Sequence, residues 1–228
     1  AHNALFQNNA GHSLEVALQA GVADAEGFGM GAGFADYDDD GDLDLFVTND
    51  GPNRLFQNQG DGTFVDVAQE AGVRGDEWSC GFAWGDVDRD GDLDLYVCNY
   101  LQYEVSLDEA ASAGATQFGA ASVPFTLNPN AFDPAPNELY LNTGSGTFVE
   151  SAAALRVDNP QGRSLAVTLC DLDGDGWLDL YINNDVSTNR LYRNLSGRQR
   201  PDGSTPLGFE DVSPVTGTAD PRGSMGLS

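Results

Sequence analysis

The feature that most limits the fold of this chain is a sequence repeat with a period close to 50 residues. Two motifs alternate within it, an Asn-x-Leu-aromatic-x-Asn segment and a loop rich in aspartate. The distance from Asn3 to Asn53 is 50 residues, and so is the distance from Asp36 to Asp86. Self-similarity at such a period is typical of solenoids, propellers and other arrays of repeated units. Copies of the first motif occupy residues 3–8, 53–58, 137–142 and 189–194.

Each repeat contains four segments with the character of short β-strands. In the second repeat, residues 78–84 precede the acidic loop and residues 93–98 follow it, and both contain aromatic or β-branched residues. The Asn-x-Leu-aromatic segment and a Gly-rich turn come next, and then a last strand such as residues 63–67 of the first repeat. Four antiparallel strands in about 50 residues are typical of a β-propeller blade. We therefore predict an all-β propeller with the acidic loops between the first and second strands of its blades.

The repeats predict a single propeller domain, residues 1–228, with one interruption. The distance from Asp86 to Asp171 is 85 residues, so about 35 residues are inserted in one blade. This insertion, at about 100–136, is expected to be a long loop between the second and third strands, with one helical turn near residues 106–111. The expected parts are a partial blade at 1–22, blades at about 23–73, 74–155 and 156–215, and a partial blade at 216–228.

The two ends of the chain are out of phase with the repeat. The sequence begins in a third strand and stops where a fourth acidic loop is expected. Either the chain is an arc of a larger propeller, or its two partial blades meet to complete a fourth blade. A chain that ends in mid-blade leaves a strand edge unpaired, which invites aggregation, and this favours the arc.

Each acidic loop has the residues needed to surround a hard cation with oxygen. Aspartates stand at loop positions 1, 3, 5 and 9, and a glycine at position 6 permits the tight turn. An EF-hand begins in the same way but requires a bidentate glutamate at position 12, where this chain has Val47, Val97 and Ile182. Strand-like segments follow the loops, so the aspartate at position 9 must close the site. Carboxylates this close repel one another unless a cation compensates, which disfavours solvated turns without metal.

The loops therefore predict three Ca2+ sites. Position 7 varies in chemistry, as expected if it contributes its backbone carbonyl. The expected ligands are Asp36, Asp38, Asp40, Asp42 and Asp44 in the first loop, Asp86, Asp88, Asp90, Asp92 and Asp94 in the second, and Asp171, Asp173, Asp175, Trp177 and Asp179 in the third.

The charge of the chain excludes several classes of partner. The formal net charge is -26, from 10 basic and 36 acidic residues. Contacts with phosphate need lysine and arginine, so nucleic acids and anionic membranes are not expected as partners. No apolar run approaches the ~20 residues of a membrane span. Loops of the extracellular kind fill at about 0.1–1 mM calcium, which the cytosol lacks, so we expect a secreted protein in an extracellular or periplasmic location.

The cysteines and histidines give weaker signals. Cys80 and Cys98 flank the second acidic loop and are expected to be cross-strand neighbours, either as a disulfide or as free buried thiols. Cys170 is interpreted as a packing residue. His2 and His12 lack a partner spacing for a zinc site and are expected to lie on the solvated surface.

The remaining polar and aromatic signals are interpreted as structural. Asn49, Asn99 and Asn184 recur after the acidic loops and are expected to cap turns. Asn194-Leu-Ser196 is a glycosylation sequon in a eukaryotic source. No G-x-S-x-G elbow, phosphate-binding loop or dinucleotide fingerprint is present, and the loop carboxylates are committed to metal. The tryptophans are expected to pack in the propeller rather than to line a sugar-binding surface; they are Trp78, Trp84 and Trp177.

With the repeat assembled, the chain resembles the FG-GAP or VCBS repeat family, the calcium-loop propellers also found in integrin α heads. The segment Phe34-Ala-Asp36-Tyr-Asp38-Asp-Asp40-Gly41-Asp42-Leu-Asp44 and its two copies carry this resemblance. More narrowly, the segments at 95–100, 134–140 and 146–148 resemble the ASPIC/UnbV-type secreted proteins. The resemblance implies seven- or eight-bladed propellers whose calcium loops stabilise the blades. The ASPIC/UnbV segment itself is not seen in this sequence.

These observations predict a calcium-stabilised extracellular propeller module that binds a protein or glycan and is not an enzyme. One alternative is the propeller scaffold of a lyase or hydrolase acting on polysaccharide, which a cleft rich in arginine, histidine or tyrosine would favour. Another is a structural subunit of a surface assembly, in which neighbouring subunits complete the unpaired terminal strands.

Overall fold

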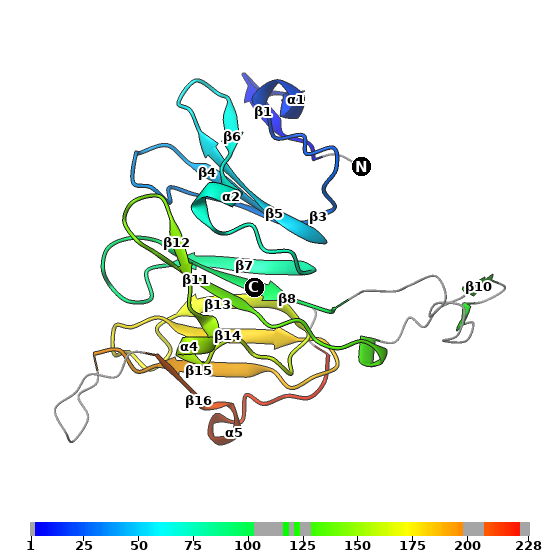
Figure 1. Ribbon diagram of the computed structural model, residues 1–228, viewed down its shortest axis with the longest axis vertical. Helices are drawn as coiled ribbons and strands as arrows, with labels where there is room; N and C mark the ends of the chain where they lie inside the picture. Colours follow the sequence, from blue (N-terminus) through cyan, green and yellow to red (C-terminus); the bar gives the residue numbers. More distant parts are fainter. Residues whose placement is uncertain (1–2, 103–115, 119–120, 124–128, 198–207, 224–228) are drawn as a thin grey trace.

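The computed structural model describes residues 3–102, 116–118, 121–123, 129–197 and 208–223. In this part of the chain, three four-stranded antiparallel sheets stand side by side (Figure 1). In each sheet the strands are neighbours in the order in which the chain makes them. The all-β fold is confirmed, and so is the position of each acidic loop between a first and a second strand.

We name the sheets blades 1, 2 and 3 in chain order. Blade 1 contains β3 (Gly29–Ala35), β4 (Asp44–Asn49), β5 (Gly51–Asn58) and β6 (Phe64–Asp66). Blade 2 contains β7 (Ser79–Gly85), β8 (Asp94–Asn99), β11 (Glu138–Asn142) and β12 (Phe148–Glu150). Blade 3 contains β13 (Ser164–Cys170), β14 (Asp179–Asn184), β15 (Arg190–Asn194) and β16 (Phe209–Asp211). The exact boundaries between the blades stay a prediction.

The N-terminal hairpin and the insertion lie outside these sheets. Strands β1 (Phe6–Asn9) and β2 (His12–Glu15) pair only with each other among the described strands and lie beyond blade 1 (Figure 1). The described sheets therefore form an open row, with this hairpin beside blade 1 and blade 3 at the far end. The insertion separates β8 from β11 and contains the hairpin of β9 (Thr116–Phe118) and β10 (Ala121–Val123) and the 3-10 turn η1 (Pro129–Ala131). The helical turn expected near 106–111 falls outside the described residues.

A four-residue helix follows the last strand of each blade and of the N-terminal hairpin, and these helices were not predicted from the sequence. A left-handed residue ends each helix, and it is glycine in three of the four cases and Arg156, at φ +63°, in the other. In the first three helices, a buried valine then donates its N–H to the first helical residue, as Val73 does to Ala68 at 3.0 Å. The helices are α1 (Ala17–Ala20), α2 (Ala68–Ala71), α4 (Ala152–Leu155) and α5 (Ser213–Thr216).

The core lies between neighbouring sheets, where the first strand of one blade packs on the blade before it. The Phe82 ring of β7 lies 5.0 Å from the Phe46 ring of blade 1, and Trp84 lies 5.9 Å from the same ring. Gly33 permits this approach, because a Cβ atom there would be 2.9 Å from the Phe82 ring. Trp84 is therefore a packing residue, as predicted.

At the strand ends away from the acidic loops, buried asparagines form hydrogen bonds within and between blades. Asn49, Asn99 and Asn184 each donate a side-chain hydrogen bond to the carbonyl of the residue just before the first asparagine of the next Asn-x-Leu-aromatic motif, so each caps the connection between second and third strands. Between blades 1 and 2, Asn53 donates to the Ser79 hydroxyl at 3.0 Å, and Ser79 donates to Asn99 at 2.8 Å.

The same arrangement joins blades 2 and 3. There, Asn137 donates to the Ser164 hydroxyl at 2.9 Å, and Ser164 donates to Asn184 at 2.9 Å. We call each of these groups an Asn–Ser–Asn bridge, and each one spans the junction between two blades.

One open alternative is decided and one sequence interpretation needs correction. All three cysteines are free thiols, so Cys80 and Cys98 follow the second of the two alternatives, and the β7–β8 pairing shifts at a bulge between Ser79 and Phe82. The sequon asparagine, Asn194, is fully buried, so a glycan has no access to its amide. His12 is exposed, as predicted, and His2 falls outside the described residues.

Candidate metal centres

The three acidic loops occupy equivalent places in the three blades. Each joins the first strand of a blade to the second, so all three lie along the same side of the row of sheets (Figure 1). We number them loop 1, loop 2 and loop 3, at residues 36–44, 86–94 and 171–179.

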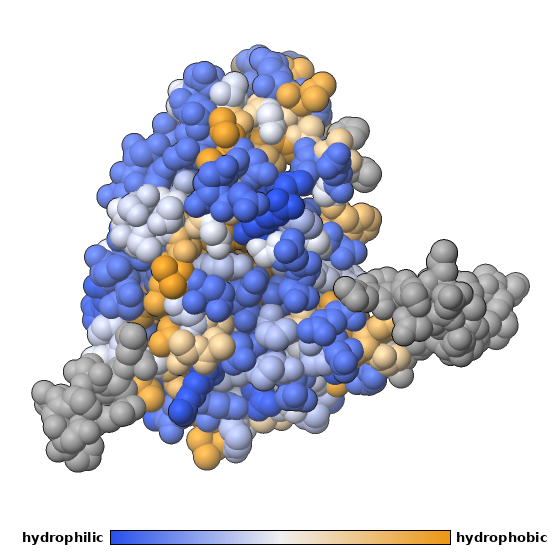
Figure 2. Space-filling view, viewed as in Figure 1, coloured by the Kyte–Doolittle hydropathy of each residue, from blue (hydrophilic) through white to orange (hydrophobic). Residues whose placement is uncertain are grey.

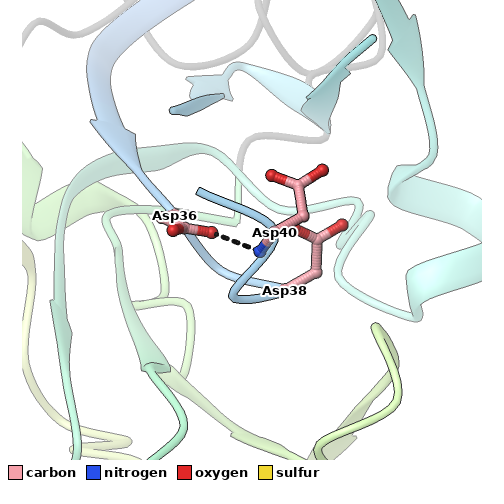
Figure 3. A group of neighbouring side chains, drawn as sticks. All are labelled: Asp36, Asp38 and Asp40. Carbon is pink, nitrogen blue, oxygen red and sulfur yellow. Dashed lines mark hydrogen bonds between the residues drawn. The ribbon is translucent and has the colours of Figure 1, made fainter. Parts of the chain in front are cut away.

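In each loop, three aspartates bring their carboxylate oxygens together. In every group, one oxygen from each residue lies within 4.8 Å of the others. Calcium binds oxygen at about 2.3–2.6 Å, so two ligands on opposite sides of one ion are at most about 4.6–5.2 Å apart. The separation is therefore small enough for a single cation to contact all three. Figure 3 shows the group of loop 1. The groups are Asp36, Asp38 and Asp40; Asp86, Asp88 and Asp90; and Asp171, Asp173 and Asp179.

The glycine at position 6 shapes each loop around its first aspartate. Gly41, Gly91 and Gly176 have φ values of +93°, +103° and +88°, in the region that favours glycine. Their N–H groups donate to the carboxylate at position 1, at 3.1 Å for Asp36, 3.2 Å in loop 2 and 2.9 Å in loop 3. In loop 1 the N–H of Asp40 donates to the same carboxylate at 3.1 Å (Figure 3). The turn thus orients the first aspartate before any metal arrives.

The aspartate at position 9 connects the loop to the body of the blade. Asp94 is buried and accepts the N–H of Val87 at 2.8 Å and the N–H of Asn142 at 2.9 Å. Asp44 and Asp179 make the same pair of bonds in their own blades. Burial raises the pKa of Asp44 to about 6 and that of Asp94 to about 7, and it also raises the pKa of Asp179. A nearby cation would favour the charged form of all three.

The side chains at position 7 point away from the carboxylate groups. The Asp92 carboxylate lies against Gly144, and the Trp177 indole lies against Gly197, in the turns between third and fourth strands. The guanidinium carbon of Arg89, in loop 2, stands 5.2 Å from the centre of the Trp177 ring. This placement agrees with a backbone role for position 7, and the carbonyl ligation itself stays a prediction.

The donor set fits a calcium ion. The residues offer only oxygen, which suits a hard cation. Within the described residues, one carboxylate oxygen each of Asp38 and Asp86 is buried without a hydrogen-bond partner, as expected of an atom reserved for a metal. Of the fifteen predicted ligands, nine belong to the three groups; Asp42, Asp44, Asp92, Asp94, Asp175 and Trp177 do not. The ligand role of each residue stays a prediction.

The residues that support the loops from the third strand were not predicted from the sequence. Gln57 donates to the Asp38 carboxylate at 2.6 Å. The last asparagine of the Asn-x-Leu-aromatic-x-Asn motif donates its N–H to the position-9 aspartate in every blade, through Asn58, Asn142 and Asn194. The recurrence of this asparagine at one place in every motif was the available signal.

Blades of four antiparallel strands, each with an aspartate loop that gathers carboxylates, define a repeat protein of the β-propeller class with candidate cation sites. The chain belongs to the family described as FG-GAP-like repeat: the family model matches residues 36–97 and 125–182, slightly more than half of the chain. Repeats of this family commonly bind Ca2+.

The chain is also similar to cartilage acidic protein 1 from several vertebrates. Identity to the Mus musculus protein is 34% over 124 residues, which is 50% of this chain and 18% of that protein. Identity to the Homo sapiens protein is 36% over 98 residues, 39% of this chain and 15% of that protein. Identity to the Xenopus tropicalis protein is 36% over 83 residues, 36% of this chain and 12% of that protein. The matched region spans less than a fifth of these relatives.

Proposed function

We propose that the chain is a calcium-stabilised extracellular propeller module that binds a protein or glycan and does not catalyse a reaction. The observation that supports this proposal best is the threefold grouping of carboxylates, each in a loop whose position-9 aspartate is held by the third strand of its own blade. Repetition of one arrangement in every blade suits a structural cation better than a single catalytic centre.

The chain's own residues prepare each site for the ion. Position-6 glycines orient the first aspartate, and the third strand holds the last one. When bound, Ca2+ supplies positive charge that compensates the clustered carboxylates. Compensation removes a repulsion that opposes the folded loop, so each blade is stabilised by its ion.

Location and partner class rest on charge and on the relatives. None of the helices in the described part of the chain combines the length and apolar character that a membrane crossing requires. The relatives are named for cartilage, a tissue rich in extracellular matrix, and their name also describes them as acidic. Figure 2 shows a face dominated by hydrophilic residues with small apolar patches between them. Such a surface, at net charge -26, suits a protein or glycan partner and not nucleic acid.

A thermal unfolding experiment with 1 mM calcium and with excess chelator tests the role of the metal. Sites with dissociation constants of about 0.1–1 mM would each add roughly 0.4–1.4 kcal/mol at this concentration. Three sites would then raise the melting temperature by roughly 3–15 °C. Asp90→Asn should remove at least about a third of this shift, and Asp39→Asn, an exposed neighbour at loop position 4, serves as the matched control. An identical melt in calcium and chelator would reject the proposal.

A second candidate, a subunit of an assembly, is favoured by exposed apolar side chains on the first and last blades. Met30 and Phe34 of β3 are 40% and 50% exposed, and Leu172 of loop 3 and Val215 of α5, which follows blade 3, are 53% and 85% exposed. Sedimentation at several concentrations distinguishes the two: a mass that grows with concentration supports assembly, and a constant monomer mass rejects it.

A further inference from the structure

One asparagine in blade 2 makes hydrogen bonds to two acidic loops at once. The N–H of Asn142 donates to Asp94, and its side-chain amide donates to the Leu93 carbonyl at 3.1 Å, both in loop 2. The same amide donates to the Tyr37 carbonyl at 2.9 Å, which belongs to loop 1 in the preceding blade. Asn142 therefore connects position 9 of one loop to position 2 of its neighbour.

Blade 3 repeats this arrangement. The N–H of Asn194 donates to Asp179 at 2.8 Å, and its amide donates to the Leu178 carbonyl at 3.1 Å, both in loop 3. The amide also donates to the Val87 carbonyl of loop 2 at 2.8 Å. Loops 1, 2 and 3 are thus joined in series by two equivalent asparagines.

These contacts are buried, so movement of either loop would disturb them. Asn142 is 5% exposed and Asn194 is fully buried, and each amide is shared between two carbonyls. A buried amide that loses its acceptor incurs a desolvation penalty. Asn58 of blade 1 donates to Leu43 of its own loop, and its described hydrogen bonds include none to another blade.

The carbonyls that receive the cross-blade bonds stand between expected metal ligands. Tyr37 lies between Asp36 and Asp38, so an ion held by these two aspartates also fixes the carbonyl of Tyr37. A loop ordered by its ion therefore orients the asparagine, and the asparagine orients the position-9 aspartate of the next loop. The second ion then binds to a loop that is already partly ordered, so its binding costs less conformational entropy.

We propose that Asn142 and Asn194 are positioning residues that couple calcium binding between neighbouring loops, so that the sites fill with positive cooperativity. The inference rests on the proposed function, because it requires the loops to bind calcium. Coupling is reciprocal: occupancy of loop 2 tightens loop 1, and occupancy of loop 1 tightens loop 2 by the same factor. One buried hydrogen bond corresponds to a factor of about five.

A calcium titration of the full chain, followed by NMR at the position-6 glycines, reads each loop separately. The N–H signals of Gly41 and Gly176 report loops 1 and 3. In the parent chain, Asp90→Asn, which removes a ligand of loop 2, should weaken binding at both neighbours by about fivefold. In an Asn142→Ala background, the same change should leave loop 1 unaffected and still weaken loop 3, through Asn194.

The control is Asn58→Ala, which removes the same amide and the bond to its own loop but no described bond between blades. It should leave the effect of Asp90→Asn on loop 1 unchanged. If Asn142→Ala does not fold, Asn142→Ser retains one donor and should reduce the coupling rather than abolish it.

Two negative outcomes can be told apart. Glycine signals that do not respond to calcium in the parent chain would reject the calcium function itself. Signals that respond at all three loops, with loops 1 and 3 indifferent to Asp90→Asn, would reject the coupling alone. Persistence of the loop 1 effect in Asn142→Ala would also overturn the role of this asparagine.

Discussion

Substitution of Gly29 by serine should stabilise the protein by completing a bridge that blade 1 lacks. Ser79 pairs with Asn99 across β7 and β8, and Ser164 pairs with Asn184 in blade 3. The corresponding partner of Asn49 in blade 1 is Gly29, which has no hydroxyl.

The missing hydroxyl leaves two buried atoms without a partner. They are the side-chain nitrogen of Asn3 and the side-chain oxygen of Asn49, which correspond to the donor and the acceptor of the two complete Asn–Ser–Asn bridges. Gly29 does not have a positive φ, so a side chain introduces no backbone strain. A Cβ atom there would be 2.9 Å from the Asn3 carboxamide, which must move by a few tenths of an ångström.

The expected gain follows from the two new hydrogen bonds. Each contributes about 0.5–1.5 kcal/mol net, and replacing glycine within a strand adds roughly 0.5 kcal/mol. After the cost of moving Asn3, we expect about 2 kcal/mol, or an increase of roughly 4–8 °C in melting temperature. Urea denaturation of Gly29→Ser in the presence of calcium measures the change in free energy of unfolding.

Gly29→Ala is the matched control, because it adds the same Cβ atom without the hydroxyl. It should be neutral or destabilising. Conversely, Ser79→Ala should cost about 1–3 kcal/mol by opening the bridge between blades 1 and 2. A serine variant no more stable than the alanine variant would refute the reasoning.

Three further predictions concern the loops and helix ends. In chelator, the free energy of unfolding should fall as the pH is raised from about 4 to about 7 in urea titrations. Burial raises the pKa of Asp44 to about 6 and that of Asp94 to about 7, so the folded chain binds these protons more tightly than the unfolded chain. Protonation of the two carboxylates therefore stabilises the folded chain. This stabilisation is complete below the ordinary pKa of 3.8 and is lost as the pH passes the raised values. Arg156→Gly should raise the melting temperature by an amount equivalent to up to about 1 kcal/mol, because Arg156 is exposed and left-handed. Asp92→Asn should leave the calcium stoichiometry measured by titration calorimetry at three, whereas Asp90→Asn should reduce it to two.

The fold was predictable because the motifs of the repeat mark the position of each strand within a blade. The acidic loop marks the turn between two strands, and the Asn-x-Leu-aromatic segment marks the third strand, so the order of strands in a blade can be read directly. The helices after the fourth strands could not be read in this way. Four residues such as Ala68–Ala71 are too few to show helical periodicity, and only the glycine that follows, Gly72, marks their end.

Only those parts of the candidate site that lie close together in the sequence could be predicted. Loop composition indicates the carboxylates and the glycine, because all of them lie within nine consecutive residues. The partners of the loops come from distant segments: Asn142 and Tyr37 are 105 residues apart. Their contact depends on how one blade sits on another, which no local pattern specifies.

The hydrogen bond from Asn142 to the backbone of loop 1 has a consequence for how the number of blades can increase during evolution. Its acceptor is a main-chain carbonyl, which every amino acid possesses, and the side chain at that position is free to differ between blades, as Tyr37, Val87 and Leu172 do. A duplicated unit would therefore find its acceptor ready on its parent copy, with no compensating mutation required. Only the asparagine must be inherited intact. Tandem duplication can thus lengthen the array one blade at a time while mutations accumulate elsewhere in the loop.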